Sequence, residues 1–355
     1  MNCNNRELLA ALSGCGNGSL QLSVHGEILK RGEFERQLRN AGLMIAEKAY
    51  GAHRLHTPHC RTTSYETSDS GLWFELRTFT LPDGELTERK RKGPDGSMWY
   101  SERAVKTKED MHLLMKMFAK AEPAPDFGAI SETIPRLGDD GIVVCRLPRS
   151  PLQSLYVEWM GPENTILALH DYPESFRSLL EAISDINIAI AEYAADSPAK
   201  VVWSAENITS DLTSPALYRE FLLPYYSRLT EIFNAKSKLH GVHMDGMLQA
   251  LVENIRETKL DFIEGFTPPP MGNLTAERAL VEWPGKSLWI NIPGSIFHES
   301  HPTAEMLIRN LVSSVADSGR AAFTIAEDLP DVQPNLEFLT NLFNKIEEPP
   351  KRVQL

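Results

Sequence analysis

Between residues 239 and 246 the sequence reads Leu-His-Gly-Val-His-Met-Asp-Gly, a short apolar run that ends in a histidine and a carboxylate. Helical patterns flank it over Pro215–Ala235 and Met247–Thr258. In an extended segment, residues two positions apart point to the same side. We therefore expect His243 and Asp245 to converge on one ion or small ligand, where they suit metal binding or proton transfer. A hydrogen bond that only fixes a strand-to-helix turn is the alternative.

The composition limits the classes of partner. The chain has 355 residues, 42% of them apolar, and its net charge is −12. An acidic chain of this kind is not expected to bind a nucleic-acid backbone or an anionic membrane surface. No apolar run approaches the roughly 18 residues that a membrane span needs, and the four cysteines show no CxxC spacing. We expect a cytoplasmic protein with a small-molecule substrate; the oligomeric state stays open.

Strand and helix patterns alternate outward from this stretch, which predicts βαβ units around parallel strands. The expected strands are Leu20–Val24, one near Tyr50–His56, Ile142–Arg146, Lys200–Ser204, Leu239–His243, Leu260–Glu264, Ser287–Asn291 and Ala321–Ala326. Eight such strands predict an α/β fold, a (β/α)8 TIM barrel. A doubly wound open sheet is the alternative, but no GxGxxG motif follows a strand.

The first half of the chain departs from this alternation of strands and helices. A helix pattern over Glu33–Lys48 is followed by alternating Thr, Tyr, Phe and Arg through Thr62–Thr80. Pro82-Asp83-Gly84 then predicts a turn before the charged ribbon Glu85–Arg91. We therefore expect one barrel domain over residues 1–355, with a β-hairpin insertion at about residues 60–100.

Polar side chains stand where the predicted strands end. In chain order they are Glu206 and Asn207, His243 and Asp245, Glu264, Asn291, and then Glu327 and Asp328. The carboxyl ends of barrel strands meet at one rim, which is where barrel enzymes hold their active sites. Carboxylates crowded there would repel one another unless a cation or a shared proton lay between them. A metal is the simplest expectation, although Asp and Asn also occur at such positions as helix caps.

One segment resembles a known family. Residues Val202–Tyr226 read Val-Trp-Ser-Ala-Glu-Asn-Ile-Thr-Ser-Asp-Leu-Thr-Ser-Pro-Ala-Leu-Tyr-Arg-Glu-Phe-Leu-Leu-Pro-Tyr-Tyr, and His243-Met-Asp-Gly follows. Together they resemble the uroporphyrinogen decarboxylase superfamily, and within it the branch of corrinoid-linked methyltransferases. The resemblance extends from about Arg6 to Ile346 and is densest after Lys200.

The chain departs from two family motifs. The family's Arg-Gln-Ala-Gly-Arg motif, which grips substrate carboxylates, has its nearest counterpart here in Arg36-Gln37-Leu38-Arg39-Asn40, which does not match. The methyltransferases that use zinc and coenzyme M carry a His-x-Cys-Gly motif and a later Cys. The resemblance places His243, Asp245 and Glu327 of this chain at the positions of that His and those two Cys. Both thiols are thus replaced by carboxylates, a donor set that binds zinc and also suits harder divalent metals.

The resemblance implies a corrinoid-dependent methyltransferase that acts on a small O- or N-methylated compound. Its cofactors would be a divalent metal, most simply zinc, and a corrinoid held by a partner protein. The expected metal ligands are His243, Asp245, Glu264 and Glu327, of which Glu264 and Glu327 are also the candidate catalytic acids. The expected substrate contacts are Trp203, Glu206, Asn207 and Asn291. Decarboxylation of a polycarboxylate, and a barrel that binds without catalysis, are the alternatives.

Overall fold

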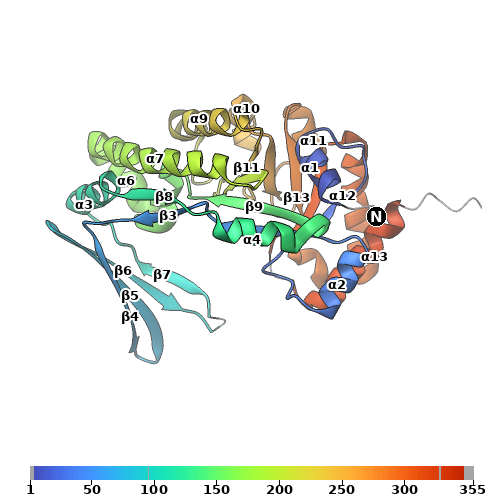
Figure 1. The fold of residues 1–355 in the computed structure, drawn as a ribbon, viewed down its shortest axis with the longest axis horizontal. Coiled ribbons are helices and arrows are strands. Elements are labelled where there is room, and N and C mark those ends of the chain that lie inside the picture. The colour runs from blue at the N-terminus through green and yellow to red at the C-terminus, as the bar shows by residue number, and fades with distance from the viewer. Residues whose placement is uncertain (1–3, 95, 328, 348–355) are drawn as a thin grey trace, which may run out of the picture. The chain divides into compact units, whose positions relative to one another are not determined.

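The computed structural model describes residues 4–94, 96–327 and 329–347. Among them, eight parallel strands close into a barrel in the order β1-β14-β13-β12-β11-β10-β9-β2. These strands are β1 (Leu22–His25), β2 (Met44–Tyr50), β9 (Gly141–Leu147), β10 (Val201–Ser204), β11 (Leu239–His243), β12 (Phe262–Phe266), β13 (Ser287–Asn291) and β14 (Ala321–Ile325). Of these, β9, β11 and β13 are labelled in Figure 1. The predicted (β/α)8 barrel is confirmed.

Helices connect the strands and flank the insertion. They are α1 (Asn5–Leu12), α2 (Glu33–Asn40), α3 (Lys108–Ala119), α4 (Gly128–Leu137), α5 (Pro151–Ser154), α6 (Pro162–Asp171), α7 (Pro173–Asp196), α8 (Pro215–Leu217), α9 (Leu223–Asn234), α10 (Val252–Glu257), α11 (Ala276–Glu282), α12 (His301–Val315) and α13 (Val332–Glu347). A π turn, η3 (Tyr218–Leu222), interrupts the predicted helix just before Pro224. A kink is expected there because proline has no N–H to donate.

The helix predicted over Glu33–Lys48 is wrong in its second half. Helix α2 ends at Asn40, and Gly42 then adopts a φ of 101°, which turns the chain into strand β2. Residues 43–46 are all buried, as in a parallel strand covered on both faces, and such a short run does not reveal its period. The strand expected near Tyr50–His56 is therefore displaced as well. In its place β3 (His53–His56) pairs antiparallel with β8 (Glu122–Pro125), outside the barrel.

The chain divides into two compact units. The first contains the barrel strands, and the second covers 53–126 and 148–193. The second unit holds the antiparallel sheet of β4 (Arg61–Asp69), β5 (Leu72–Leu81), β6 (Gly84–Lys92) and β7 (Met98–Glu102). The predicted hairpin insertion is thereby confirmed, including its turn, where Leu81 pairs with Gly84. That the whole chain forms one domain stays a prediction.

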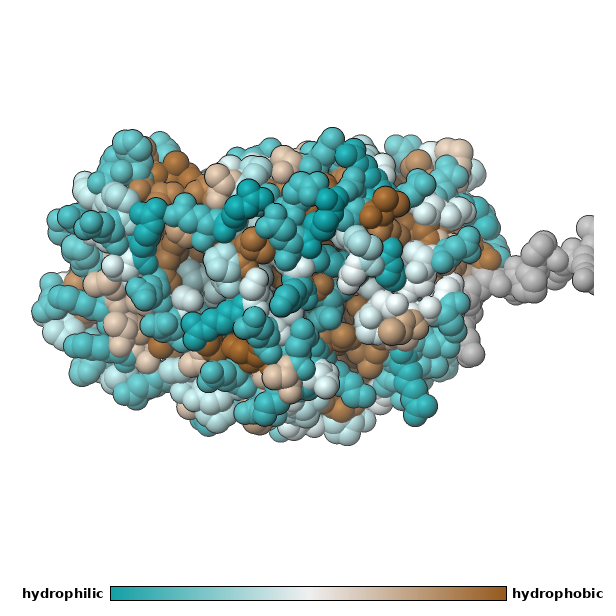
Figure 2. All heavy atoms as spheres, turned by 90° about the horizontal axis from the view of Figure 1, so that it is seen from above, coloured by the Kyte–Doolittle hydropathy of each residue, from teal (hydrophilic) through white to brown (hydrophobic). Residues whose placement is uncertain are grey.

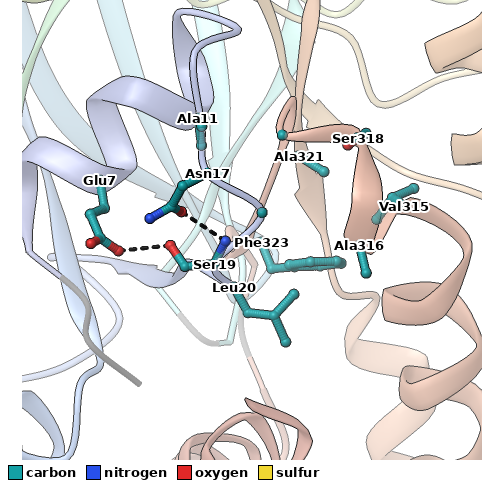
Figure 3. A pocket seen from close by; sticks show the side chains of 13 residues that line it. Glu7, Ala11, Asn17, Ser19, Leu20, Val315, Ala316, Ser318, Ala321 and Phe323 are labelled. Atoms are coloured by element: carbon teal, nitrogen blue, oxygen red, sulfur yellow. Dashed lines mark hydrogen bonds between the residues drawn. The ribbon is translucent and has the colours of Figure 1, made fainter.

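Helix α1 closes the amino end of the barrel. Its Leu8, Ala11 and Leu12 are buried in the same core as inward-facing residues of the strands. Beside them the Glu7 carboxylate accepts a hydrogen bond from the Ser19 hydroxyl at 2.7 Å (Figure 3). The hollow there has about 10 Å³ of space for water, room for about one molecule.

Among the described residues, no helix is long and apolar enough to cross a bilayer. On the face shown in Figure 2, hydrophilic residues predominate and hydrophobic ones lie in small groups between them.

Phe262 on β12 fills the barrel interior. It is fully buried, and its ring packs against Trp289 with centroids 6.1 Å apart. Its space depends on Gly241 of β11, because a Cβ at that position would lie 2.0 Å from the Phe262 ring. The neighbouring β11 therefore needs a residue without a side chain here.

We predict that Gly241→Ala destabilises the protein by about 1–3 kcal/mol, the usual effect of overfilling a packed core. Gly285→Ala is the matched control, because a Cβ there meets no atom within 4 Å. Thermal unfolding followed by circular dichroism measures both. Equal unfolding temperatures for the two variants would contradict this account of the barrel interior.

Candidate active site

His243 and Glu264 meet at the carboxyl end of the barrel. They are direct partners in the parallel pairing of β11 and β12, so their side chains point to the same side. His243 Nδ1 lies 2.5 Å from Glu264 Oε2, a short hydrogen bond between a ring nitrogen and a carboxylate. The side chain of Glu264 is 2% exposed and that of His243 is 20% exposed. A buried carboxylate is thus paired with a histidine that is partly exposed at the carboxyl end of the barrel, which we call the mouth.

Gly265 lets the two side chains come this close. It adopts a φ of +68°, and the pairing of β12 with β13 shifts register between Glu264 and Phe266. A Cβ on Gly265 would lie 2.4 Å from Cε1 of the His243 ring. Only glycine combines this left-handed backbone with the free space that the imidazole occupies. The irregularity at Gly265 therefore allows the His243 ring to pack directly against β12.

Two more groups complete what we call the mouth cluster, which consists of His25, His243, Asp245 and Glu264. His25, the last residue of β1, is buried and places Nε2 3.1 Å from Glu264 Oε1. On the other side, His243 Nε2 lies 3.5 Å from Asp245 Oδ2. Glu264 is therefore shared by two imidazoles, and His243 faces a carboxylate at each of its nitrogens. His243 and Asp245 thus lie side by side, and their convergence on one ion or small ligand stays a prediction.

The charges of the mouth cluster reinforce one another. Burial alone would lower the pKa of His243, but the charge and hydrogen bond of Glu264, together with the nearby Asp245 carboxylate, raise it to about 9. Burial would likewise raise the pKa of Glu264, yet the charge and hydrogen bond of His243, with help from His25, hold it well below its usual range. Near neutral pH the pair is therefore an imidazolium against a carboxylate.

Two cations lie beside this cluster around the Trp203 indole. Lys48 Nζ lies 4.2 Å from a Trp203 ring centroid, and Arg146 Cζ lies 5.8 Å away. The same indole meets the His243 ring edge-on, with centroids 5.8 Å apart. Burial lowers the pKa of Lys48, and the charges of Glu264 and Glu27 offset part of that effect. The mouth thus carries basic as well as acidic side chains.

The residues predicted to contact the substrate differ in how exposed they are and in their neighbours. Glu206 is buried, and its charge adds to burial in raising the pKa of the Tyr218 hydroxyl. Asn207 is exposed beyond the end of β10. Trp203, with 5% exposure, is the predicted contact that the structure brings to the mouth cluster. Contact of these residues with a substrate stays a prediction.

Glu327 is held by a different set of partners. Its Oε1 accepts hydrogen bonds from Asn291 Nδ2 at 3.1 Å and from the Gly294 amide at 2.7 Å. Asn291 Oδ1 in turn accepts from the Ala326 amide. These bonds join the ends of β13 and β14 and fix the start of the short helix η5 (Gly294–His298). Asp328 lies outside the described residues.

The metal site is not supported by this arrangement. Among the described residues, no three His, Cys, Asp or Glu side chains are placed to hold an ion. The chemistry of the donors explains this, because a metal binds imidazole through an unprotonated nitrogen. Both nitrogens of His243 face carboxylates, which favours a proton on each. The metal set of His243, Asp245, Glu264 and Glu327 therefore stays a prediction that the donor geometry does not fit.

Two residues at the barrel rim, His25 and Lys48, are not among those predicted from the sequence. His25 directly follows the predicted strand Leu20–Val24, so the rule that found the other rim residues applies to it. Lys48 is not expected at the rim from the sequence, because the pattern over residues 44–48 predicts a helix rather than a barrel strand. Once Met44–Tyr50 is a strand, Met44, Ala46 and Lys48 share one face, and the first two lie in the barrel core.

We predict that histidine-labelled protein will show a His243 pKa near 9 in an NMR titration. Glu264→Gln should lower that pKa, because burial then disfavours the charged imidazole with only Asp245 to offset it. Glu327→Gln is the control and should leave the His243 pKa unchanged, since Glu327 bonds to Asn291 and Gly294. Equal shifts in the two variants would refute the assigned pairing.

Comparisons with known proteins agree with this architecture. A methyltransferase from Methanosarcina mazei has a similar structure, with a TM-score of 0.51 and 12% identity over 71% of this chain and 73% of that one. A candidate vitamin B12-independent methionine synthase from Listeria monocytogenes gives a TM-score of 0.41 and 13% identity over 69% and 71%. At this identity the first likeness shows the fold alone. Among curated proteins no sequence matches.

The sequence model of the uroporphyrinogen decarboxylase (URO-D) family matches residues 127–265. This segment includes β9 to β12 and therefore His243, Asp245 and Glu264. The resemblance noted in the sequence is confirmed over this segment. Over residues 127–265, the chain is thus similar in sequence to the uroporphyrinogen decarboxylase family.

Proposed function

We propose that this protein is an enzyme that transfers the methyl group of a small O- or N-methylated compound to a corrinoid carried by a partner protein. The observation that carries the proposal is the buried His243–Glu264 pair at the barrel mouth. Demethylation leaves an alkoxide or an amine, and both are poor leaving groups unless a proton reaches them as the bond breaks. An imidazolium held at the mouth can supply that proton.

The geometry favours Nε2 of His243 as the donating nitrogen. His243 Nδ1 is engaged by Glu264 at 2.5 Å, whereas Nε2 lies 3.5 Å from Asp245, longer than an ordinary hydrogen bond. A substrate oxygen or nitrogen can therefore take the place beside Nε2 without breaking the bond to Glu264. Glu264 fixes the ring and stabilises its charge, as a buried carboxylate does for histidine in other enzymes.

The proposed step conserves atoms and electrons. The methyl carbon forms a bond with an electron pair of the acceptor while its bond to the substrate oxygen or nitrogen breaks. The pair from the broken bond stays on that atom, which takes the proton from His243 Nε2. The neutral imidazole is then reprotonated from solvent, with Asp245, half exposed, as the adjacent carboxylate. Glu327 remains a candidate acid, and its bonds to Asn291 and Gly294 favour a positioning role.

One observation favours a second candidate function. Decarboxylation of a polycarboxylate needs basic side chains at the mouth, and Lys48 lies there with Arg146. In that reaction His243 would protonate the carbon that loses carbon dioxide. Lys48 was not recognised at the rim from sequence, so this alternative gains support from the structure.

We predict that the protein methylates free cob(I)alamin from at least one member of a panel of methoxylated and N-methylated compounds, followed by cobalt absorbance. His243→Gln should lower this rate by about 10²–10⁴, the usual contribution of a general acid. The rate should fall as the pH rises through about 9, because the active form of His243 is the protonated one. His170→Gln, a change at an exposed histidine of α6, is the control.

The same preparations are given uroporphyrinogen. Release of carbon dioxide without cobalt methylation from any donor would replace the methyltransferase proposal with the decarboxylase. A rate that His243→Gln leaves unchanged would remove His243 from the chemistry.

A further inference from the structure

The outermost strand of the antiparallel sheet, β4, pairs on one side only. Its partner is β5, and among the described residues no other strand or loop forms a backbone hydrogen bond with it. An edge strand of this kind leaves the N–H and C=O groups of alternate residues without a strand partner. Eight of its nine residues are exposed, and Thr67 is half-buried. The free side of β4, labelled in Figure 1 with the rest of its sheet, is therefore open to another strand.

Strand β4 also lacks several features by which proteins protect a sheet edge. Edge strands are usually short, bulged, or interrupted by proline or lysine. β4 is nine residues long, contains neither proline nor lysine, and pairs with β5 without a register shift from Arg61 to Asp69. At the opposite edge, β7 is five residues long, and its pairing with β6 shifts register between Arg89 and Lys90. Of the two edges, β4 is the one suited to pair again.

The chemistry of β4 is nearly the same when its sequence is read in either direction. It runs Arg-Thr-Thr-Ser-Tyr-Glu-Thr-Ser-Asp, with Tyr65 at the centre. A second copy aligned antiparallel about Tyr65 places Arg61 opposite Asp69 of the other copy. The same alignment pairs Thr63 with Thr67, and Tyr65 with its own equivalent. Opposite charges, threonine pairs and aromatic pairs are cross-strand combinations that stabilise antiparallel sheets.

The two end charges lie where another chain can reach them. Arg61 is exposed and has no ion-pair partner among the residues that the structure describes. The Asp69 side chain is 69% exposed, and its carboxylate accepts a hydrogen bond from the Ser70 hydroxyl at 3.0 Å and lies 3.7 Å from Arg89. A two-fold axis would make the contact between Arg61 and Asp69 twice.

Neighbouring registers lose this complementarity. A two-fold axis normal to the sheet keeps each face of the sheet on one side, so it can only be centred on a residue. Centring it on Glu66 would set two Glu66 carboxylates against each other. Centring it on Ser64 would place Arg61 opposite Thr67. The charges therefore select the alignment about Tyr65.

We propose that two copies of this chain associate through their β4 edges, antiparallel about a two-fold axis at Tyr65. The two four-stranded sheets then form one sheet of eight strands. Such a contact is isologous and closes as a dimer, which leaves no β4 edge free. One strand pair makes a small interface, so we expect a dissociation constant of about 1–100 µM. This inference does not depend on the proposed methyl transfer.

Sedimentation velocity of the full chain from about 1 to 500 µM measures this association. The wild-type protein should shift from monomer to dimer within that range. Arg61→Asp brings two acids together at each end of the strand pair, and Asp69→Arg brings two bases together. Each variant alone should raise the dissociation constant about tenfold or more, because like charges directly opposite each other destabilise a strand pair.

A mixture of the two variants gives the sharpest result. When Arg61→Asp pairs with Asp69→Arg, each end again brings an acid opposite a base, so the mixture should dimerise although neither variant does so alone. Arg91→Asp is the control, since Arg91 is exposed on the inner strand β6 and its change alters the charge by the same amount. It should dimerise like the wild-type protein.

Circular dichroism checks that each variant is folded. Tyr65→Lys covers the case in which one charge variant folds poorly, because it places two like charges at the two-fold axis and should also weaken the dimer. The inference is overturned if the wild-type protein stays monomeric over the whole range. It is equally overturned by a dimer that every folded β4 variant leaves unchanged, or by two folded charge variants whose mixture does not dimerise.

Discussion

The pairing of Glu264 with His243 is the constraint on which the rest of the mouth depends. A carboxylate with 2% exposure cannot stay charged without a partner, and breaking such a pair typically costs about 3–5 kcal/mol. The fold meets this need locally. Neighbouring parallel strands place the two residues in register, and Gly265 leaves room for the ring. Below them, Gly241 lets Phe262 fill the barrel.

The same pairing favours a proton over a metal ion as the positive charge that neutralises the carboxylates at the mouth. The sequence supplies an imidazole and several carboxylates at one rim, and crowded carboxylates require positive charge between them. A protonated His243 can supply that charge, since its ring lies between Glu264 and Asp245, while His25 contacts Glu264 from the other side. A site of this kind is suited to give a proton to a leaving group, and coordination of a metal would first require His243 to lose one.

Much of this architecture could be predicted from sequence, and particular residues show why the rest could not. Strands such as Leu239–His243 and Ser287–Asn291 were predicted with their exact ends, because apolar runs closed by polar residues mark the barrel rim. The spacing of His243 and Asp245 likewise placed the two side chains near each other, and the structure shows 3.5 Å between Nε2 and Oδ2. Strand β2 was mistaken for a helix because a short buried run has no readable period. The partners of Glu327 depend on how two distant loops meet, which no local pattern encodes.

The most direct measurement of the central claim is neutron diffraction from crystals of the perdeuterated protein grown near pH 7. It locates hydrogen isotopes on each nitrogen of His243. The account predicts deuterium on both Nδ1 and Nε2, with Glu264 unprotonated beside Nδ1. A single deuterium, or a metal ion at about 2.0–2.1 Å from either nitrogen, would contradict it.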